Sequence, residues 1–477
     1  MRILLVSHRY PPRHTAGTEV YTADLAAGLA ERGHEVTVFA TEKDIAREHL
    51  SLGEREHAGV RVVELVNNLH YDTFEETWRY PAAEEAFAGA LERLRPELVH
   101  FQHLMYLSAG CLERAARAGA AIAYTLHDFW FTCPRFGQRV HLDGSLCEEV
   151  DLDRCVGCTL GSPFAQSALE RRVAGWVAAV RGATGMDLGP AVRRLGGKLR
   201  GAADGGVGEG GTEVGGGHDD ETLAARRALL AERRETLLSA GIRWVDRFLS
   251  PSRFLRERLI EWGLPAERTL HLATGADLDL FGSGSRTPRG PRLRVAFIGT
   301  LIPLKGPHLL LEAWGLLGAD CRARAELELC GSDRHEPEYQ ARLAASAARV
   351  GAHMRGPLER RDVAERLRST DLLVVPSLWF ENSPLVILEA FAAGTPLLVS
   401  DRGGMTELVE PGSGGEHFRM GDARDLAAKL EHFITSPQSL AALGQRPPRL
   451  PSRADHIDEL VGLYEQLLTE RGRGGER

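Results

Sequence analysis

The chain has 477 residues, of which 43% are hydrophobic and 26% are charged, and its formal net charge is −8. This length favours two domains, because one hydrophobic core seldom serves so many residues. The acidic balance argues against bulk nucleic-acid binding, which needs a basic surface. No apolar run approaches a membrane span, and the N-terminal apolar stretch is too short for a signal peptide, so a cytoplasmic protein is expected.

The first forty residues predict a strand–helix–strand unit. Residues 3–6 are a continuous apolar run, typical of a strand buried on both faces of a parallel sheet. The following helix places Tyr21, Leu25 and Leu29 on one face and ends at Gly33. Further short strands are predicted at residues 35–40, 98–101 and 122–126.

The composition changes between about residues 182 and 217, where glycine dominates. Too little apolar surface is present there to fold, so a flexible insertion is predicted. The basic residues 193–200 could touch anionic lipid, although a solvated basic face is the favoured interpretation. A charged helix is expected over residues 220–240, and residues 248–252 predict a strand end that meets a helix start.

A second alternation of strands and helices begins at residue 293. Together the two series predict an α/β protein with two Rossmann-like, doubly wound parallel sheets. The first domain is expected over residues 1–280 and the second over 290–450, with the join in residues 277–292. In the second series, strands are predicted at residues 294–299, 327–330, 371–376 and 395–400, and a helix at residues 309–314.

The segment after the strand at 371–376 predicts an anion site. Ser383 suits the N-cap of a helix and Pro384 its first position. The free N–H groups of Leu385 and Val386 would then point out of the carboxyl edge of the sheet. Such a helix start suits a diphosphate.

Glu381 and Glu389 flank this helix start. Carboxylates repel phosphate, so they are more plausible as acceptors from hydroxyl groups, one for a ribose and one for a sugar ring. Two solvated glutamates fit the spacing equally well. Lys305, in a turn after a strand, supplies a cation for the diphosphate. Taken alone, a surface lysine would explain it.

These motifs together resemble the family 4 glycosyltransferases (glycosyl transferases group 1), which are retaining enzymes of the GT-B fold. The family's signature, a Glu, seven residues and a second Glu, matches Glu381 and Glu389. Other matching motifs are residues 16–19, His127-Asp128, residues 250–254, residues 274–277, Lys305-Gly306, Asp371, Pro376-Ser377, and Gly403-Gly404 with Glu407.

The resemblance implies two domains with a nucleotide-sugar in the cleft between them. It implies transfer from a UDP- or GDP-sugar to a glycan, lipid-linked or other hydroxyl acceptor, without a cofactor for the chemistry. Glu389 would bind the ribose, Glu381 the transferred sugar and Lys305 the diphosphate. Further donor-binding positions would be Gly17, Thr300, Gly356, Leu358, Asn382, Ser383, Pro384 and Leu385.

His127 would approach the sugar near its reacting carbon, so the catalytic set would be His127, Glu381 and Lys305. The alternative for His127 is a hydrogen-bonded histidine at a strand end. Retention without a placed nucleophile favours front-face substitution, in which the donor phosphate helps to deprotonate the acceptor. Thr300 stands where the family usually has an arginine, and Gly17-Thr18 where it has two glycines.

Four cysteines, Cys133, Cys147, Cys155 and Cys158, follow His127 in a polar segment. The Cys155–Cys158 spacing lets two thiolates reach one ion, and four thiolates suit structural zinc. An iron–sulfur cluster and four ordinary cysteines are the alternatives.

Two other functions compete with transfer. An oxidoreductase would need three glycines after its first strand, but residues 8–17 hold one. A catalytically silent glycosyltransferase-like scaffold stays open. Related enzymes often extend lipid-linked or polysaccharide chains, which would place this one at the cytoplasmic face of the membrane. An amphipathic helix at 454–470, within the C-terminal segment 451–477, is expected to return to the first domain.

Overall fold

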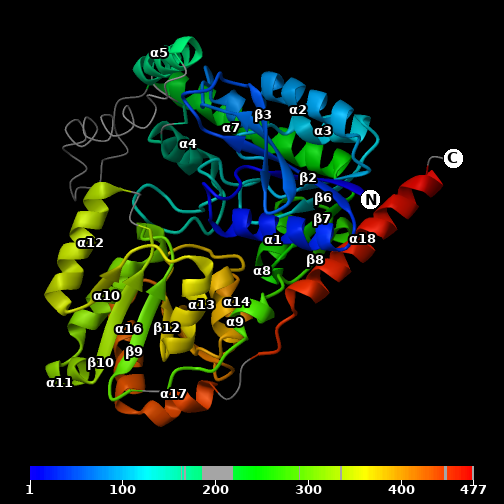
Figure 1. Ribbon diagram of the computed structural model, residues 1–477. Helices are drawn as coiled ribbons and strands as arrows, with labels where there is room; N and C mark the ends of the chain where they lie inside the picture. The colour runs from blue at the N-terminus through cyan, green and yellow to red at the C-terminus, as the bar shows by residue number, and fades with distance from the viewer. Residues whose placement is uncertain are drawn as a thin grey trace. The chain divides into compact units, whose positions relative to one another are not determined.

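The computed structural model describes residues 1–162, 164–165, 168–184, 219–288, 290–332, 336–444 and 448–474. The predicted glycine-rich insertion lies almost wholly outside these residues. The chain divides into two compact units (Figure 1). Unit 1 comprises residues 1–250, 256–271 and 457–477, and unit 2 comprises residues 251–255 and 272–456.

Unit 1 is built on an eight-stranded sheet with the order β3-β4-β2-β1-β5-β6-β7-β8. Every neighbouring pair is parallel except the β3–β4 hairpin at the edge. The central strand β1 is buried along most of its length, as expected for a strand covered on both faces. The strands are β1 (Arg2–Ser7), β2 (Glu35–Glu42), β3 (Leu52–His57), β4 (Val60–Val66), β5 (Leu98–Phe101), β6 (Ala121–Thr125), β7 (Arg247–Ser250) and β8 (Thr269–His271).

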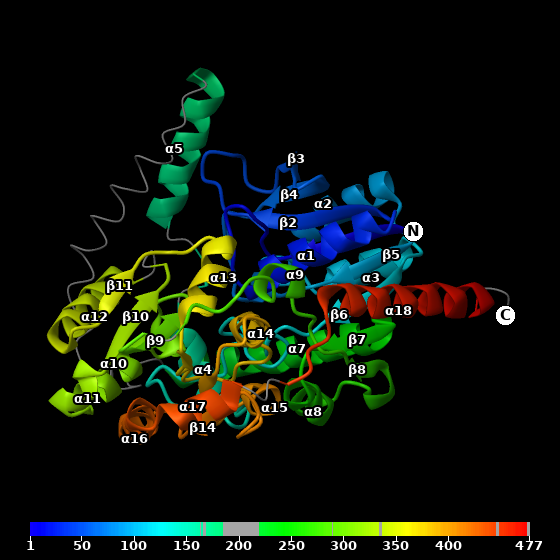
Figure 2. The same cartoon turned by 60° about the horizontal axis from the view of Figure 1, so that its bottom comes forward.

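Helices surround this sheet, and the first, α1, buries Tyr21, Leu25 and Leu29 as the sequence predicts. The end of α18 also belongs to unit 1, beside β6 and β7 (Figure 2). Its Tyr464 hydroxyl lies 2.6 Å from His100 Nδ1. The helices and 3-10 turns are α1 (Gly17–Glu31), η1 (Glu75–Thr77), α2 (Pro81–Leu94), α3 (Gly110–Arg117), α4 (Leu152–Leu160), α5 (Ala168–Thr184), α7 (Asp220–Trp244), α8 (Arg253–Trp262), η2 (Ala266–Arg268) and α18 (Arg453–Gly474).

Unit 2 contains a six-stranded parallel sheet with the order β11-β10-β9-β12-β13-β14. The strands are β9 (Leu293–Ile298), β10 (Ala325–Cys330), β11 (His353–Arg355), β12 (Leu372–Val375), β13 (Leu397–Ser400) and β14 (Gly415–Phe418). The helices and the 3-10 turn are α9 (Leu278–Phe281), η3 (Pro303–Lys305), α10 (Pro307–Leu316), α11 (Ala319–Ala323), α12 (Pro337–Val350), α13 (Arg360–Ser369), α14 (Leu385–Ala392), α15 (Met405–Leu408), α16 (Ala423–Thr435) and α17 (Pro437–Gly444).

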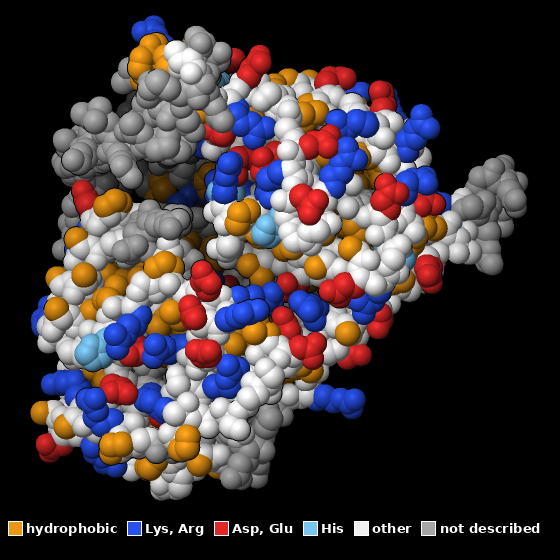
Figure 3. All heavy atoms as spheres, viewed as in Figure 1, with side chains coloured by type: hydrophobic (Ala, Val, Ile, Leu, Met, Phe, Trp, Pro, Cys, Tyr) orange, Lys and Arg blue, Asp and Glu red, His pale blue; other side chains and the backbone are white. Residues whose placement is uncertain are grey.

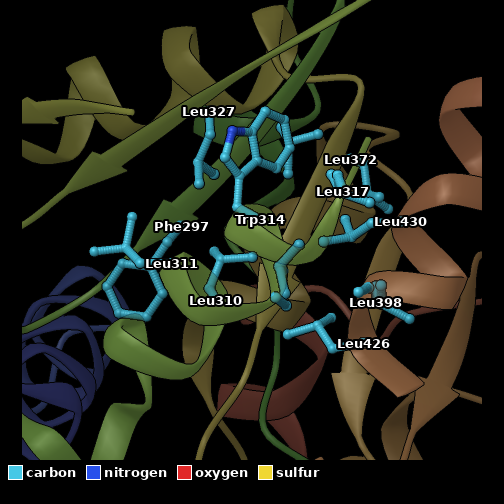
Figure 4. Close-up of a cluster of buried hydrophobic side chains, with 14 of the residues drawn as sticks. Phe297, Leu310, Leu311, Trp314, Leu317, Leu327, Leu372, Leu398, Leu426 and Leu430 are labelled. Atoms are coloured by element: carbon cyan, nitrogen blue, oxygen red, sulfur yellow. The ribbon is translucent and has the colours of Figure 1, made fainter. Parts of the chain in front are cut away.

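The main core of unit 2 lies between the sheet and its helices. Figure 4 shows Trp314 of α10 beside Leu327 of β10, with Leu426 and Leu430 of α16 in the same cluster. Burial of this many large side chains holds the sheet rigid. The predicted α/β class, with two Rossmann-like parallel sheets, is confirmed.

On the face drawn in Figure 3, acidic and basic side chains are interspersed. Within the described part of the chain, no helix is both long enough and apolar enough to cross a bilayer.

Candidate functional site

The strand order of unit 2 reverses between β9 and β12, since the chain runs outward from β9 to β11 and then outward again from β12 to β14. Loops at the carboxyl ends of strands on either side of such a reversal diverge, which leaves room for a ligand. Lys305 lies in the loop after β9, and Glu381 in the loop after β12. The topology therefore places two predicted site residues at this position.

The structure joins these residues directly. Lys305 Nζ lies 2.5 Å from Glu381 Oε1, and the Ser377 hydroxyl donates to the same oxygen at 2.8 Å. Glu381 is 7% exposed. Its burial raises the pKa, but the Lys305 charge and the hydrogen bonds outweigh burial and hold the pKa below its ordinary value. Glu381 is therefore an ionised acceptor at neutral pH.

The two loops are held close by backbone contacts. The Leu378 N–H donates to the Leu304 carbonyl at 2.8 Å. Gly306 has φ of 67°, and a Cβ there would lie 1.9 Å from the Pro376 carbonyl oxygen. A side chain would push the loops apart, so glycine after Lys305 is required by packing. The Lys-Gly motif thus has a structural reason beside its proposed chemical one.

A glycine that follows β13, Gly404, supports the loop that carries Glu381. The Gly404 N–H donates to the Glu381 carbonyl at 2.7 Å. A Cβ on Gly404 would lie 1.7 Å from the Asn382 carbonyl oxygen. The Asn382 side chain in turn accepts from the Ser252 hydroxyl. Motifs widely separated in sequence are therefore assembled around one loop.

The helix start differs from its predicted form by one residue. Helix α14 begins at Leu385, and Pro384, with ψ of 119°, is the N-cap instead of the first helical residue. Ser383 precedes the cap, and its buried hydroxyl has no hydrogen-bond partner among the described residues. In the part of the chain that the structure describes, no side chain caps the helix, so its first N–H groups have no capping acceptor there. The prediction that Ser383 caps the helix was wrong, because Pro384 takes that position. The uncapped N–H groups at the helix start still suit an anion. Glu389 lies half-buried one turn into α14.

The other residues predicted to contact the nucleotide-sugar in unit 2 follow β9 and β11. Thr300 and Leu358 are half-buried, and Gly356 is exposed. The Gly356 carbonyl accepts from the Gly331 N–H at 3.2 Å, which ties the loop after β11 to the end of β10. Their contact with a nucleotide stays a prediction.

In unit 1, His127 follows β6 and contacts α1 and the loop after β5. Its Nε2 lies 2.9 Å from Gln102 Oε1. Its ring packs edge-on against Tyr21, with centroids 5.1 Å apart. These contacts fix the position of the imidazole, and its catalytic role stays a prediction. Gly17 begins α1, and a Cβ there would meet nothing within 4 Å, so no internal contact explains this glycine.

Sequence reasoning missed a polar cluster beside His127. His8 Nε2 lies 3.4 Å from Glu19 Oε1, and His103 Nε2 lies 3.1 Å from Asp128 Oδ2. The Met105 N–H donates to His103 Nδ1, so the His103 proton sits on Nε2 and is donated to Asp128. Burial, and then the charges of neighbouring histidines and Arg9, hold the pKa of His8 well below its ordinary value. The signal was available: His8, His103 and Asp128 each follow a parallel strand by one to three residues.

The four predicted cysteine ligands lie in one region of unit 1. Burial, followed by the three other thiols, raises the pKa of Cys155 to about 12. Cys147 Sγ donates to the Glu149 carbonyl at 3.1 Å, and Cys158 Sγ lies 3.4 Å from His141 Nδ1. Among the described residues, no three histidine, cysteine or carboxylate side chains are arranged to hold an ion. The thiols are near one another but turned toward other partners.

Comparison with solved structures defines the class of fold. HepE of Anabaena, solved in complex with UDP and glucose, matches with a TM-score of 0.59 and 16% identity over 98% of this chain and 99% of its own. Sucrose-phosphate synthase of Thermosynechococcus elongatus matches with a TM-score of 0.60 and 18% identity over 99% and 98%. The fold is that of the GT-B glycosyltransferases.

Two family models match the chain: Glycosyltransferase Family 4 over residues 15–173, and Glycosyl transferases group 1 over residues 285–448. The chain belongs to the family 4 glycosyltransferases.

Curated relatives include the D-inositol 3-phosphate glycosyltransferase of Geodermatophilus obscurus, 32% identical over 46% of this chain and 52% of its own. That of Nocardiopsis dassonvillei is 30% identical over 48% and 58%. The chain spans only about half the length of these relatives.

Proposed function

We propose that this protein is a retaining glycosyltransferase that moves a sugar from a nucleotide-diphosphate-sugar to a hydroxyl acceptor. The observation that carries the proposal is the Lys305–Glu381 pair, placed at the strand reversal beside the uncapped start of α14. A cation, a set of free N–H groups and an ionised carboxylate at one sheet edge suit a diphosphate joined to a sugar.

Each group has a distinct part in this chemistry. The N–H groups of Leu385 and Val386 and the Lys305 ammonium bind the diphosphate, whose charge grows as the sugar departs. Glu381 accepts from hydroxyls of the transferred sugar, and Glu389 accepts from the ribose. Because Thr300 stands where the family usually has an arginine, Lys305 is the side chain that balances the charge of the phosphate. The pairing with Glu381 positions the ammonium before the donor arrives.

The finer steps are supported by the family resemblance. We propose front-face substitution with retention, in which the leaving phosphate helps to deprotonate the acceptor and His127 approaches the reacting carbon. Gly17, Asn382, Ser383, Pro384, Gly356 and Leu358 complete the donor contacts. The UDP bound to HepE supports a UDP-sugar as the first donor to assay, followed by a GDP-sugar.

The acceptor is proposed at the level of chemical class. The relatives named for inositol 3-phosphate, together with the family resemblance, support a hydroxyl of a glycan, a lipid-linked sugar or a small phosphorylated polyol. Lipid-linked substrates would bring a cytoplasmic protein to the inner membrane surface.

The decisive assay measures nucleotide release from UDP- and GDP-sugars by wild type, Glu381→Gln and the control Glu365→Gln. Glu365 is exposed on α13, in unit 2. Transfer predicts that Glu381→Gln lowers kcat by about 100-fold, the usual scale for a group that binds the transition state, while the control keeps full activity. Equal, negligible rates in all three proteins would favour the silent scaffold.

We further propose that Cys133, Cys147, Cys155 and Cys158 hold a structural zinc ion. Their mutual proximity supports this, as does Arg139, a buried guanidinium that donates to the carbonyls of Cys147 and Glu148 at 2.8 and 2.6 Å. Its charge opposes the rise that burial causes in the pKa of the Cys147 thiol. A bound zinc ion would turn the four sulfurs toward one point and so cross-link the segment from Cys133 to Cys158.

Metal content measured by mass spectrometry tests the zinc proposal. One zinc per chain is expected in wild type and in Cys321→Ser, whose thiol lies in the core of unit 2. The double variant Cys155→Ser/Cys158→Ser should lose it. Metal-free wild type, or unchanged metal in the double variant, would contradict the proposal. Brown colour with bound iron would identify an iron–sulfur cluster instead.

A further inference from the structure

A pocket of about 450 Å³ opens within unit 1. Its walls include residues from the loops at the carboxyl ends of parallel strands: Lys43 after β2, Leu69 after β4 and Met105 after β5. The volume lies in the range of small-molecule sites, and the carboxyl edge of a parallel sheet is where such ligands bind.

The cysteine-bearing segment forms another wall of this pocket. Arg135 and Phe136, between Cys133 and Cys147, line it, as does Thr159 at the end of α4. Helix α4 packs on α7, which brings Arg233 to the same pocket (Figure 1). The segment from Cys133 to Cys158, for which we propose a structural zinc ion, therefore also contributes to the wall of a pocket.

The lining has a distinctive chemistry. Three cations, Lys43, Arg135 and Arg233, line the pocket, and none of its described lining residues is a carboxylate. Aromatic rings supply much of the remaining surface: Tyr71, Phe74, Tyr106, Trp130, Phe136 and Phe164. Flat apolar faces beside cations suit a sugar ring that carries a negative charge.

Arg233 is only 4% exposed. Its Nη1 and Nη2 donate to the carbonyls of Phe131 and Trp130 at 3.2 and 2.5 Å, and it lies over the Trp130 ring. Burial lowers its pKa to about 10, so the guanidinium keeps its charge at neutral pH. Its hydrogen-bond partners are backbone carbonyls, which leave a positive charge beneath the pocket.

Three lining residues also adopt a backbone conformation that their side chains disfavour. Leu69, Tyr106 and Phe136 have φ of 56°, 65° and 52°. Bulky residues rarely occupy this left-handed region, and strain of this kind concentrates at functional sites. Phe136 is 44% exposed and lies near Tyr106, with ring centroids 6.5 Å apart. Much of the Phe136 ring is therefore open to solvent although its backbone is strained.

We propose that this pocket receives the acceptor, and that the acceptor is a saccharide bearing an anionic group. Its ring stacks on Tyr106 and Phe136, and the anion faces Lys43 and Arg135 above the buried charge of Arg233. The inference rests on the proposed transferase function and names the substrate class of its acceptor side.

Calorimetric titration of the full chain with glucose 6-phosphate, glucuronate and glucose tests this proposal. At least one anionic sugar should bind, and about tenfold or more tighter than glucose, since charge-assisted contacts are absent for the neutral sugar. A phosphate preference or a carboxylate preference would each identify the anion. Equal binding of glucose, or no binding of either anion at millimolar concentration, would overturn the proposal.

Variants separate binding from folding. Arg135→Ala and Lys43→Ala should each weaken anionic-sugar binding about tenfold. Phe136→Gly should abolish binding yet leave the melting temperature unchanged or raised, because glycine relieves the left-handed strain. The matched control Leu142→Ala removes a 42% exposed side chain of the same segment that does not line the pocket, and it should bind normally. A Phe136→Gly protein that binds as wild type contradicts the pocket's role.

Failure of the acceptor proposal can be distinguished from failure of the proposed transferase function. UDP or GDP binding to unit 2, followed by thermal shift, reports on the donor site alone. Nucleotide binding without anionic-sugar binding would defeat only the acceptor inference. Absence of both would count against the transferase itself.

Discussion

At the scale of single residues, the site depends on Lys305 and Glu381 being present together. Glu381 is buried, whereas the Lys305 side chain is 26% exposed. Removing the ammonium leaves a buried carboxylate without a counter-charge, which costs more than the pair contributes when intact. The loss of stability caused by either single substitution therefore includes the cost of leaving its partner unpaired.

A double-mutant cycle measures this dependence. Lys305→Met should lower the free energy of unfolding by about 2 kcal/mol, less than for a fully buried pair because the ammonium is partly solvated. Adding Glu381→Gln should recover at least half of that loss. The measurement is urea unfolding of the four proteins. Additive losses would show that the pair is not coupled.

The pH dependence of stability follows from the same carboxylate. The folded-state pKa of Glu381 lies below its ordinary value of 4.5. Its contribution to stability is therefore present above pH 4.5 and is lost as the pH falls through the folded pKa. The difference in unfolding free energy between wild type and Glu381→Gln should be constant from pH 8 to about pH 5 and shrink at lower pH. A difference that grows on acidification would contradict the assignment.

At the scale of elements, the loop between β12 and α14 is shaped by neighbours that sequence patterns do not reveal. Gly404 after β13 touches Asn382 so closely that a side chain cannot fit. Apolar runs predicted β12 and β13, because strands buried on both faces are apolar along their length. The β3–β4 hairpin was missed because β3 alternates between exposed and half-buried residues, which leaves no apolar run.

A pair of glycine substitutions tests the support of this loop. Gly404→Ala should lower the unfolding free energy by about 2 kcal/mol through displacement of the Asn382 carbonyl, and should weaken nucleotide binding with it. Gly318→Ala is the matched control, since a Cβ there meets nothing within 4 Å. It should change stability by less than about 0.5 kcal/mol. Thermal melts with and without UDP measure both effects, and equal behaviour of the two variants would refute the packing argument.

The helix start of α14 shows the limit of local sequence rules. Ser383 and Pro384 fit the preferences of a cap and a first turn, yet Pro384 is extended and takes the cap position itself. The pairing of Lys305 with Glu381 could not be predicted from spacing, because 76 residues separate them. The strand order of the sheet, and not local sequence, brings them together.

At the scale of the whole molecule, each unit is compact, and the chain's last helix completes unit 1. Tyr464 is buried against His100, which in turn contacts Thr125 of β6. Arg247 of β7 pairs with Glu470 at 3.0 Å. Alternating strands and helices predicted the two parallel sheets. The sequence also places His8, His103 and Asp128 just after strands, but only the fold shows which of these side chains pair.

The contribution of α18 can be measured through one side chain. Tyr464→Ala should lower the free energy of unfolding of unit 1 by about 3 kcal/mol, since a large buried side chain and its hydrogen bond are lost. Tyr464→Phe removes only the hydroxyl and should cost about 1 kcal/mol. Hydrogen exchange of β5 and β6 amides locates the effect. Unchanged protection in Tyr464→Ala would contradict the packing of α18 on unit 1.

The central claim is that the start of α14, with Lys305 beside it, binds the diphosphate of a nucleotide-sugar. A crystal structure of the chain grown with UDP tests this most directly. We expect phosphate oxygens within hydrogen-bonding distance of the Leu385 and Val386 N–H groups and of Lys305 Nζ, with Glu381 still buried beside them. UDP bound with its phosphates away from that helix start would contradict it.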